Sequence, residues 1–351
     1  MNQQVQARVN GERCAALSLR QLMCGVFIWR TTMTSLLPWC GSAAWWVALL
    51  GLLPGVAVAW LFRWTMQLTG AATVTENVRA CMGRVGGAVF SILLALLLLV
   101  EGLATLTTLL TVFTQGVGTR GTQFTLAILT GVVLLCCLHR EGLPRAVHLL
   151  RWGMVAFLIV VAAALARDVH LSNLYPLYGT GTEKVSTAMV KGSSLGWPFL
   201  LLLTVPSCKK RGRLCSGILS VVLALGLVFL TVLTIPQERI MQYEGIANVV
   251  LLPVRYQSNA VRVAGMCLLM LSFFMALSGA VQLASECLVA PFSQARGWLP
   301  CALLAFLVTT QALDINILWA ILQWIQPWLL FPVAVLSLIM WPIAYFRRKA
   351  A

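Results

Sequence analysis

Apolar residues of this chain gather in long runs that are separated by short polar segments. A helix that crosses the ~30 Å hydrocarbon core of a bilayer needs about 20 mostly apolar residues. Runs of this kind recur along nearly the whole chain, so the pattern predicts an all-α polytopic membrane protein with about ten transmembrane helices. The predicted spans are residues 17–37, 43–62, 86–116, 123–138, 149–166, 192–207, 214–235, 261–289, 298–313 and 325–346.

Two of the predicted connections are longer than simple turns. Residues 64–85 are weakly amphipathic and are predicted to form a cytoplasmic connection between the second and third spans. Residues 167–191 contain aromatic residues and a proline, followed by a stretch rich in Gly and Thr. An outer loop of this composition either covers a central cavity as a lid or serves as a linker. Residues 314–324 form an amphipathic stretch before the last span.

The charged residues support the membrane assignment and give the orientation. Hydrophobic residues make up 60% of the chain and charged residues 10%, whereas a soluble domain typically carries about 25% charged residues. The net charge of +15 would suit nucleic acid, but Lys and Arg form short clusters between apolar runs, as at 209–213. With ten spans and a cytoplasmic N-terminus, 17 of the 25 Lys and Arg face the cytoplasm and seven the outside. The positive-inside rule therefore predicts that both termini are cytoplasmic and argues against a nucleic-acid partner.

No catalytic or metal-binding pattern stands out in the sequence. The eleven cysteines form no CxxC pair, and most lie inside apolar runs, where Cys behaves as a small hydrophobic residue. The three histidines are scattered over predicted loops. We therefore expect no enzyme activity, no metal, no cofactor and no disulfide framework.

Two opposite charges are predicted to lie deep in the membrane. Arg30 is about 13 residues into the first span and Glu101 about 15 residues into the third, which places both roughly 20 Å from the cytoplasmic boundary. Charges at this depth are costly and usually functional. The pair either faces a polar cavity that binds a small solute, or joins two packed helices as a structural ion pair. Charge reversal separates the two, because a structural pair tolerates it better than a ligand site.

Polar interruptions occur in the first and sixth spans. Residues 29–35 (WRTTMTS) precede Pro38, and residues 192–198 (GSSLGWP) end on a proline, so the sixth span is predicted to break near Gly196. Interrupted spans at matching positions of two five-span halves indicate a transporter-like binding site. Alternatively, the Thr and Ser side chains bond back to carbonyls of an unbroken helix. The candidate ligand-binding residues are Arg30, Thr31, Thr34, Glu101, Ser194, Gly196 and Trp197.

Several short segments resemble the GerAB-like spore germination proteins. Residues 17–22 (LSLRQL) resemble their entry into the first span, which is followed by the apolar second span beginning near Trp45 and Trp46. Gly83, Gly86 and Gly87 resemble their entry into the third span. Residues 168–177 (DVHLSNLYPL) resemble the exit from the fifth span, and the basic cluster after a short sixth span and the basic C-terminal end agree with the same layout.

This resemblance implies the fold of the amino acid–polyamine–organocation transporter superfamily, also called LeuT-like. The chain would then be a single transmembrane domain, 1–351, made of two inverted five-helix repeats at about 17–166 and 192–346. The resemblance also implies the membrane subunit of a germinant receptor in the spore inner membrane, that is, a bacterial plasma membrane. Such a subunit senses a nutrient, often an amino acid, around spans one, three, six and eight. Its implied partners are an A-type membrane subunit and a C-type lipoprotein.

The chain departs from this family at both interruptions. Family members usually have a Gly-rich break in span one, where this chain has Trp29-Arg30-Thr31-Thr32, and often an acid after the span-six break, where it has Trp197-Pro198-Phe199. The identity of the ligand is therefore not carried over. The alternatives are a secondary transporter for amino acids or other small solutes, coupled to protons through Glu101, and a structural scaffold for partner subunits.

Overall fold

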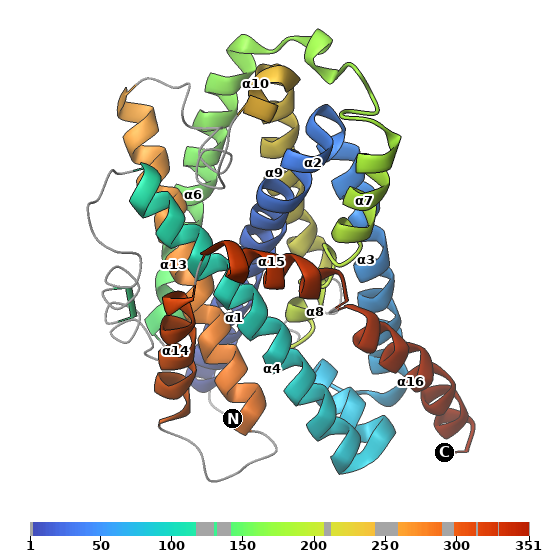
Figure 1. Cartoon of the computed structure of the whole chain (residues 1–351). Helices are drawn as coiled ribbons and strands as arrows, with labels where there is room; N and C mark the ends of the chain where they lie inside the picture. Colours follow the sequence, from blue (N-terminus) through green and yellow to red (C-terminus); the bar gives the residue numbers. More distant parts are fainter. Residues whose placement is uncertain are drawn as a thin grey trace.

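The computed structural model describes residues 3–116, 130–131, 142–206, 212–242, 259–289, 298–313, 315–328 and 330–350. Within these residues the chain is helical and contains no strand (Figure 1). Five helical segments are long and apolar enough to cross a membrane, at Gly11–Thr69, Val74–Thr114, Gly142–Asp168, Arg262–Val289 and Ile317–Phe346. Their length and composition suggest a membrane protein, as the hydrophobic pattern predicts.

The first of these segments contains two antiparallel helices. Helix α1 (Gln3–Thr31) continues through the short helical pieces η1 (Thr32–Leu36) and α2 (Leu37–Cys40), and the chain then reverses in the turn η2 (Gly41–Ala43). Gly41 has φ +52°, a left-handed conformation that glycine adopts at little cost. Helix α3 (Ala44–Thr69) returns along the bundle, as the two predicted spans 17–37 and 43–62 require.

The predicted long connection at 64–85 is wrong. Helix α3 extends to Thr69 and α4 (Val74–Gly116) begins five residues later, so the connection is a tight turn. Asn77 holds this turn together, because its amide donates to Thr65 Oγ1 at 2.7 Å and its carbonyl oxygen accepts from Thr69 Oγ1 at 2.7 Å. The glycine at position 83, with φ +75°, kinks α4 near its start. The end of α3 and the start of α4 contain few apolar residues, so their hydropathy resembles that of a loop. This is why the sequence predicted a long connection here.

The connection after helix α6 (Gly142–Leu165), predicted to lie outside the membrane, is partly helical. It contains the short turns η3 (Ala166–Asp168) and η4 (Leu171–Leu174), and then helix α7 (Thr182–Gly192). It is tied to the bundle by Ser42, whose hydroxyl donates to the carbonyl of Pro176 at 2.7 Å, and by the indole of Trp46, which donates to the carbonyl of Leu177 at 3.0 Å. The segment 167–191 is therefore packed against the turn between α1 and α3.

Most of the remaining helices follow the predicted apolar runs, and the sixth, fourth and last predicted spans depart from them. Within the sixth predicted span, 192–207, the described residues 193–206 contain turns and the short helix α8 (Phe199–Leu202). The fourth predicted span, 123–138, lies outside the described residues except for 130 and 131. Most of the basic cluster at 209–213 also lies outside them. The last predicted span divides between α15, η6 and α16. The helices from α9 onward are α9 (Gly212–Thr234), α10 (Gln237–Gln242), α13 (Asn259–Val289), α14 (Leu299–Thr309), η5 (Thr310–Ala312), α15 (Ile315–Ile325), η6 (Gln326–Trp328) and α16 (Leu330–Ala350).

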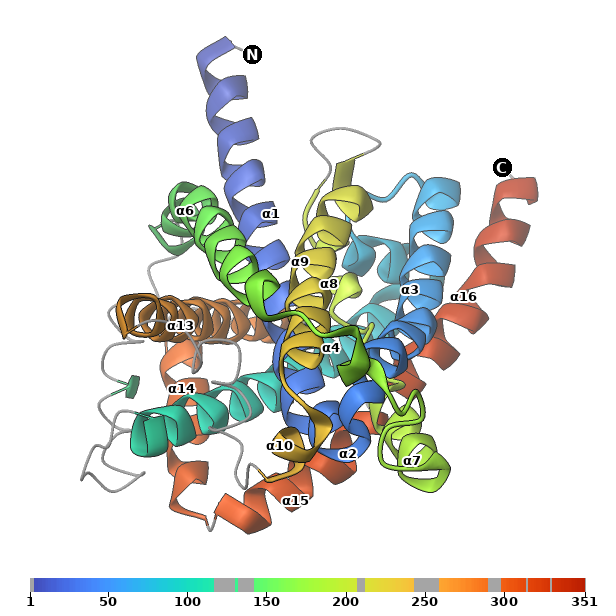
Figure 2. The same ribbon diagram turned by 90° about the horizontal axis from the view of Figure 1, so that it is seen from above.

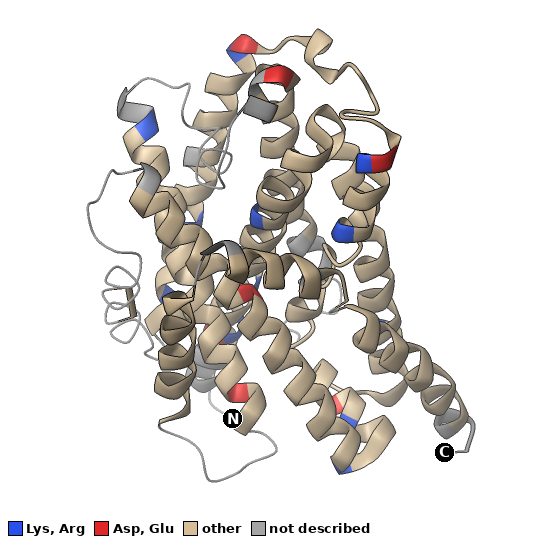
Figure 3. Cartoon of the chain, viewed as in Figure 1, with Lys and Arg blue, Asp and Glu red and all other residues tan. Residues whose placement is uncertain are grey.

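Helix α1 runs through the middle of the bundle. It packs along α6, α9 and α13, while α13 also packs along α4 and α16 along α3. The two chain ends lie on the same side of the bundle in both views, and the 166–181 connection and α10 lie at the opposite end (Figures 1 and 2). Charged residues are sparse along the helices between these ends (Figure 3). Large apolar side chains are exposed on the outside, including Leu53, Trp60, Leu149 and Phe331, as expected of a surface that faces lipid.

Candidate ligand-binding site

Arg30 of α1 and Glu101 of α4 form an ion pair in the interior of the bundle. Arg30 is 0% exposed and Glu101 is 2% exposed. One guanidinium nitrogen, Nη2, donates to Glu101 Oε2 and also to the hydroxyl of Thr31 at 3.0 Å. The pairing of these two charges, predicted from their similar depth along the first and third spans, is confirmed.

The Arg30 guanidinium keeps unused hydrogen-bonding capacity. Its Nε and Nη1 atoms are buried and have no hydrogen-bond partner among the described residues. A buried donor without a partner typically costs about 1–3 kcal/mol. The fully buried cation is therefore held by one carboxylate and one hydroxyl, both at Nη2, while Nε and Nη1 keep donors that a further acceptor would satisfy.

Trp197 closes the site from the sixth predicted span. Its indole Nε1 donates to Glu101 Oε1 at 3.2 Å, so one carboxylate oxygen of Glu101 accepts from α1 and the other from the turns between α7 and α8. The ring stacks on Phe27 of α1, with centroids 6.1 Å apart and an angle of 23° between the planes. Trp197 is 1% exposed and is among the largest fully buried side chains of the described residues. It thereby joins the first, third and sixth spans through one side chain.

The polar stretch in the first span does not break the helix. Residues 32–36 form a widened, π-helical turn that stays continuous with α1 and α2. The hydroxyls of Thr32 and Thr34 donate back to the carbonyls of Ile28 and Arg30, at 2.7 and 2.8 Å. The expected span-one break is corrected to this turn, because the threonines satisfy carbonyls of their own helix. Single π-helical turns inside α-helices are frequent at functional sites.

The predicted interruption of the sixth span is confirmed. Residues 193–198 form consecutive turns between α7 and α8, and their backbone bonds run three residues back, as from Trp197 N to Ser194 O at 3.0 Å. The turns lie directly against α3, where a Cβ placed on Gly196 would come within 2.8 Å of the Cα of Gly55. A Cβ on Gly51 would likewise lie 2.9 Å from the carbonyl carbon of Gly192.

These glycine contacts were not identified from the sequence, although a signal is present. Gly51 and Gly55 are four residues apart, and so are Gly192 and Gly196. Small residues at this spacing allow two backbones in a membrane to approach closely. The two pairs therefore place the interrupted segment, and with it Trp197, against α3.

The structure brings together most of the predicted site residues. Thr31, Glu101, Ser194 and Trp197 line one gap together with Phe27, Leu195 and Pro198, and Arg30 contacts both Thr31 and Glu101. Thr34 instead bonds to its own helix, and Gly196 packs on α3. The gap between these side chains is too narrow for a water molecule. The site is thus closed in this conformation.

Replacement of Trp197 by Phe tests the contact between the indole and the carboxylate. Phe keeps most of the ring packing against Phe27 but removes the donor to Glu101. Because hydrogen bonds to charged groups contribute about 1.5–3 kcal/mol, we expect a loss of this size in the free energy of unfolding. Denaturant titration in detergent measures it, and unchanged stability would show that the 3.2 Å contact contributes nothing.

A scan against protein-family models and a search of the curated proteins found no match to this chain. Within the described residues, no three His, Cys, Asp or Glu side chains gather in a group that could hold a metal ion.

Proposed function

We propose that this chain is the nutrient-sensing membrane subunit of a spore germinant receptor, with a LeuT-like fold of ten spans in two inverted repeats. The nutrient, a small molecule such as an amino acid, binds between the first, third and sixth spans. An A-type membrane subunit and a C-type lipoprotein complete the receptor in the spore inner membrane. The resemblance to GerAB-like proteins is the source of the receptor assignment, and the geometry of the buried site supports the sensing role.

Two features support the repeat arrangement. The irregular helical turns at 32–36 and 193–198 fall in the first element of each proposed repeat. Helix α1, which leads into the first turn, and the second turn itself meet at the same buried carboxylate, because Arg30 and Trp197 both donate to Glu101. In transporter-like folds, irregular backbone at membrane depth occurs where it lines a binding site.

The observation that carries the proposal is the incomplete pairing of Arg30. A fully buried guanidinium, whose Nε and Nη1 atoms have no partner in the described part of the chain, lies beside a gap lined by Thr31, Ser194 and Trp197. The carboxylate of an amino acid would accept from one of these donors and so satisfy a buried group that is otherwise costly. Since the gap is closed, the ligand enters only when Trp197 moves away. Binding then shifts the population toward the open arrangement, by as much as the ligand binds the open arrangement more tightly than the closed one.

A secondary transporter is the second candidate function. The observation that favours it is Glu101, a buried carboxylate that contacts α1 through Arg30 and the interrupted segment 193–198 through Trp197, and so is placed to couple a proton to their relative movement. Uptake of labelled amino acids into proteoliposomes distinguishes the two functions. Accumulation driven by a proton gradient supports transport, and binding without accumulation supports sensing.

Binding of an amino-acid, sugar and nucleoside panel to the protein in lipid nanodiscs tests the sensing proposal. Thr31 lines the gap and holds Arg30, so Thr31→Val is expected to weaken binding of the active ligand about tenfold, which corresponds to 1.4 kcal/mol. The matched control is Thr309→Val, an exposed threonine on α14, which should leave affinity unchanged. Equal affinity of the wild type and Thr31→Val would contradict binding in this gap.

A further inference from the structure

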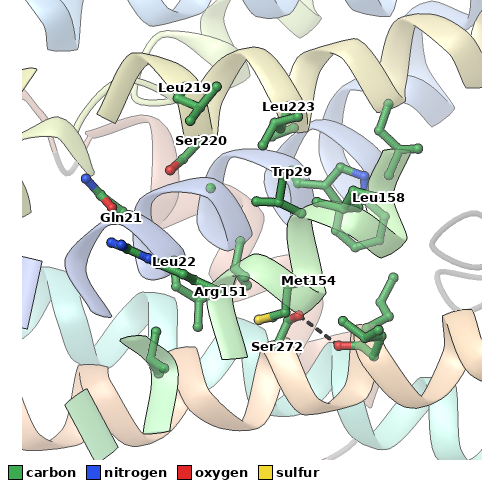
Figure 4. Close-up of a pocket in the computed structure, with 18 of the residues that line it drawn as sticks. Gln21, Leu22, Trp29, Arg151, Met154, Leu158, Leu219, Ser220, Leu223 and Ser272 are labelled. Atoms are coloured by element: carbon green, nitrogen blue, oxygen red, sulfur yellow. Dashed lines mark hydrogen bonds between the residues drawn. The ribbon is translucent and has the colours of Figure 1, made fainter. Parts of the chain in front are cut away.

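A second, larger cavity lies on the other face of α1. It has a volume of about 360 Å³, is partly open, and is lined by α1, α6, α9 and α13 (Figure 4). The residues that α1 contributes, among them Ser18, Leu22 and Trp29, recur at helical spacing along one stripe. Phe27 and Thr31, which line the gap beside Glu101, are absent from this stripe. Helix α1 therefore separates two distinct internal spaces.

Most polar side chains of this cavity gather at one end, while the indole Nε1 of Trp29, buried without a hydrogen-bond partner among the described residues, lies at the other. Figure 4 shows Gln21, Arg151 and Ser220 together at one side, and Trp29 and Leu158 at the other. The Arg151 guanidinium has no carboxylate in the cavity wall to donate to, because none of the lining residues is Asp or Glu. Its Nη1 donates to the hydroxyl of Ser18 at 3.3 Å, and its Nε is buried without a hydrogen-bond partner among the described residues. This end of the cavity thus carries an excess positive charge.

The rest of the wall is almost entirely apolar. Leu22, Val26, Val155, Leu223 and Phe273 belong to it, and the few hydroxyls deeper in the cavity are occupied within their own helices. The hydroxyl of Ser272, for example, donates to the carbonyl of Leu268 at 2.8 Å. A ligand that matches this wall has one anionic head and an apolar body. The volume is within the range of about 300–1,000 Å³ that is typical of small-molecule sites.

We propose that this cavity binds a long-chain fatty acid, with its carboxylate at Arg151 and its acyl chain extended along α1 toward Trp29. A carboxylate suits this end, because a guanidinium binds it in two-point geometry and Gln21 adds an amide donor. In a bilayer the acyl chain is already surrounded by apolar groups, so its transfer into the cavity contributes little selectivity. Recognition therefore depends on the charged head. This site is separate from the nutrient site and does not depend on the proposed receptor function.

Photo-crosslinking in nanodiscs of uncharged lipid tests the proposal. The probe is a palmitic acid analogue with a diazirine in its chain, and labelled peptides are mapped by mass spectrometry. We expect saturable labelling of the α1, α6 and α13 residues that line the cavity, with at least a tenfold loss in Arg151→Gln. The methyl ester of the probe, which lacks the charge, should label these residues no more than Arg151→Gln does.

Two further variants and one further probe serve as controls for the labelling experiment. Arg145→Gln removes an exposed cation of the same helix that pairs with Glu12, and it should leave labelling unchanged. Ala224→Phe fills the cavity and should abolish labelling while Arg151 remains. Equal labelling by acid and ester, or in wild type and Arg151→Gln, would overturn the proposal. Saturable labelling by a diazirine phosphatidylglycerol, with none by the free acid, would also overturn it and would identify an acidic phospholipid as the occupant.

Discussion

Removal of either partner from the Arg30–Glu101 pair is expected to destabilise the protein by about 3–5 kcal/mol, because the remaining charge is left buried and uncompensated. Both side chains are at most 2% exposed, so water cannot replace the lost partner. Arg30→Ala and Glu101→Ala should each show this loss in denaturant titrations in detergent. Few other single substitutions in the described helices should have so large an effect.

Replacing both charges at once should restore most of the lost stability. A double variant, Arg30→Met with Glu101→Leu, removes both desolvated charges and keeps much of the side-chain volume, a change that is often neutral in stability. The matched control is Arg145→Ala, whose exposed pair with Glu12 should contribute less than about 1 kcal/mol. If Glu101→Ala were as mild as Arg145→Ala, the pair would not be buried as described.

Gly55→Leu is expected to displace the interrupted sixth-span segment from α3. A side chain at this position would overlap backbone atoms of Gly196, which cannot move as the end of a flexible side chain can. Overpacking of this kind typically costs about 1–3 kcal/mol or more, and the displacement also carries Trp197 away from Glu101. We therefore expect lower stability together with faster modification of a cysteine introduced at Ser194, which is buried in the wild type.

A second glycine substitution separates this steric effect from the effect of glycine on helices in general. Gly153 lies in α6 and has open space where a Cβ would stand. Gly153→Ala should leave the cysteine at position 194 protected and should raise stability slightly, by about 0.5–1 kcal/mol. Protection of position 194 in Gly55→Leu, equal to that in Gly153→Ala, would show that the close glycine contact does not hold the segment in place.

The sequence is sufficient to predict the helical class, most helix positions and the central ion pair. Long apolar runs give the helices, because the bilayer sets a minimum length for each span. Arg30 and Glu101 could be paired in advance, since two rare charges enter from the same side and reach similar depth. The break before Pro198 could also be predicted, because proline removes a backbone donor and restrains the residue before it.

Features that depend on contacts between distant segments could not be predicted in the same way. The gap beside Glu101 is closed because Trp197 turns its indole toward that carboxylate, and hydropathy contains no information on side-chain direction. The cavity around Arg151 requires four helices that are far apart in sequence to leave space between them. The Gly51 and Gly55 contacts have a visible spacing, but only the packing shows which helix they meet.

Ligand binding by the Arg30→Met, Glu101→Leu double variant is the most direct test of the central claim. This variant is expected to be folded, so a loss of binding cannot be attributed to unfolding once its stability is measured. If the buried pair forms the ligand site, the wild type binds one member of the nutrient panel saturably, and the folded double variant binds it at least a hundredfold more weakly. If the double variant binds that ligand as tightly as the wild type, the pair is a structural link between α1 and α4, and the proposed site is wrong.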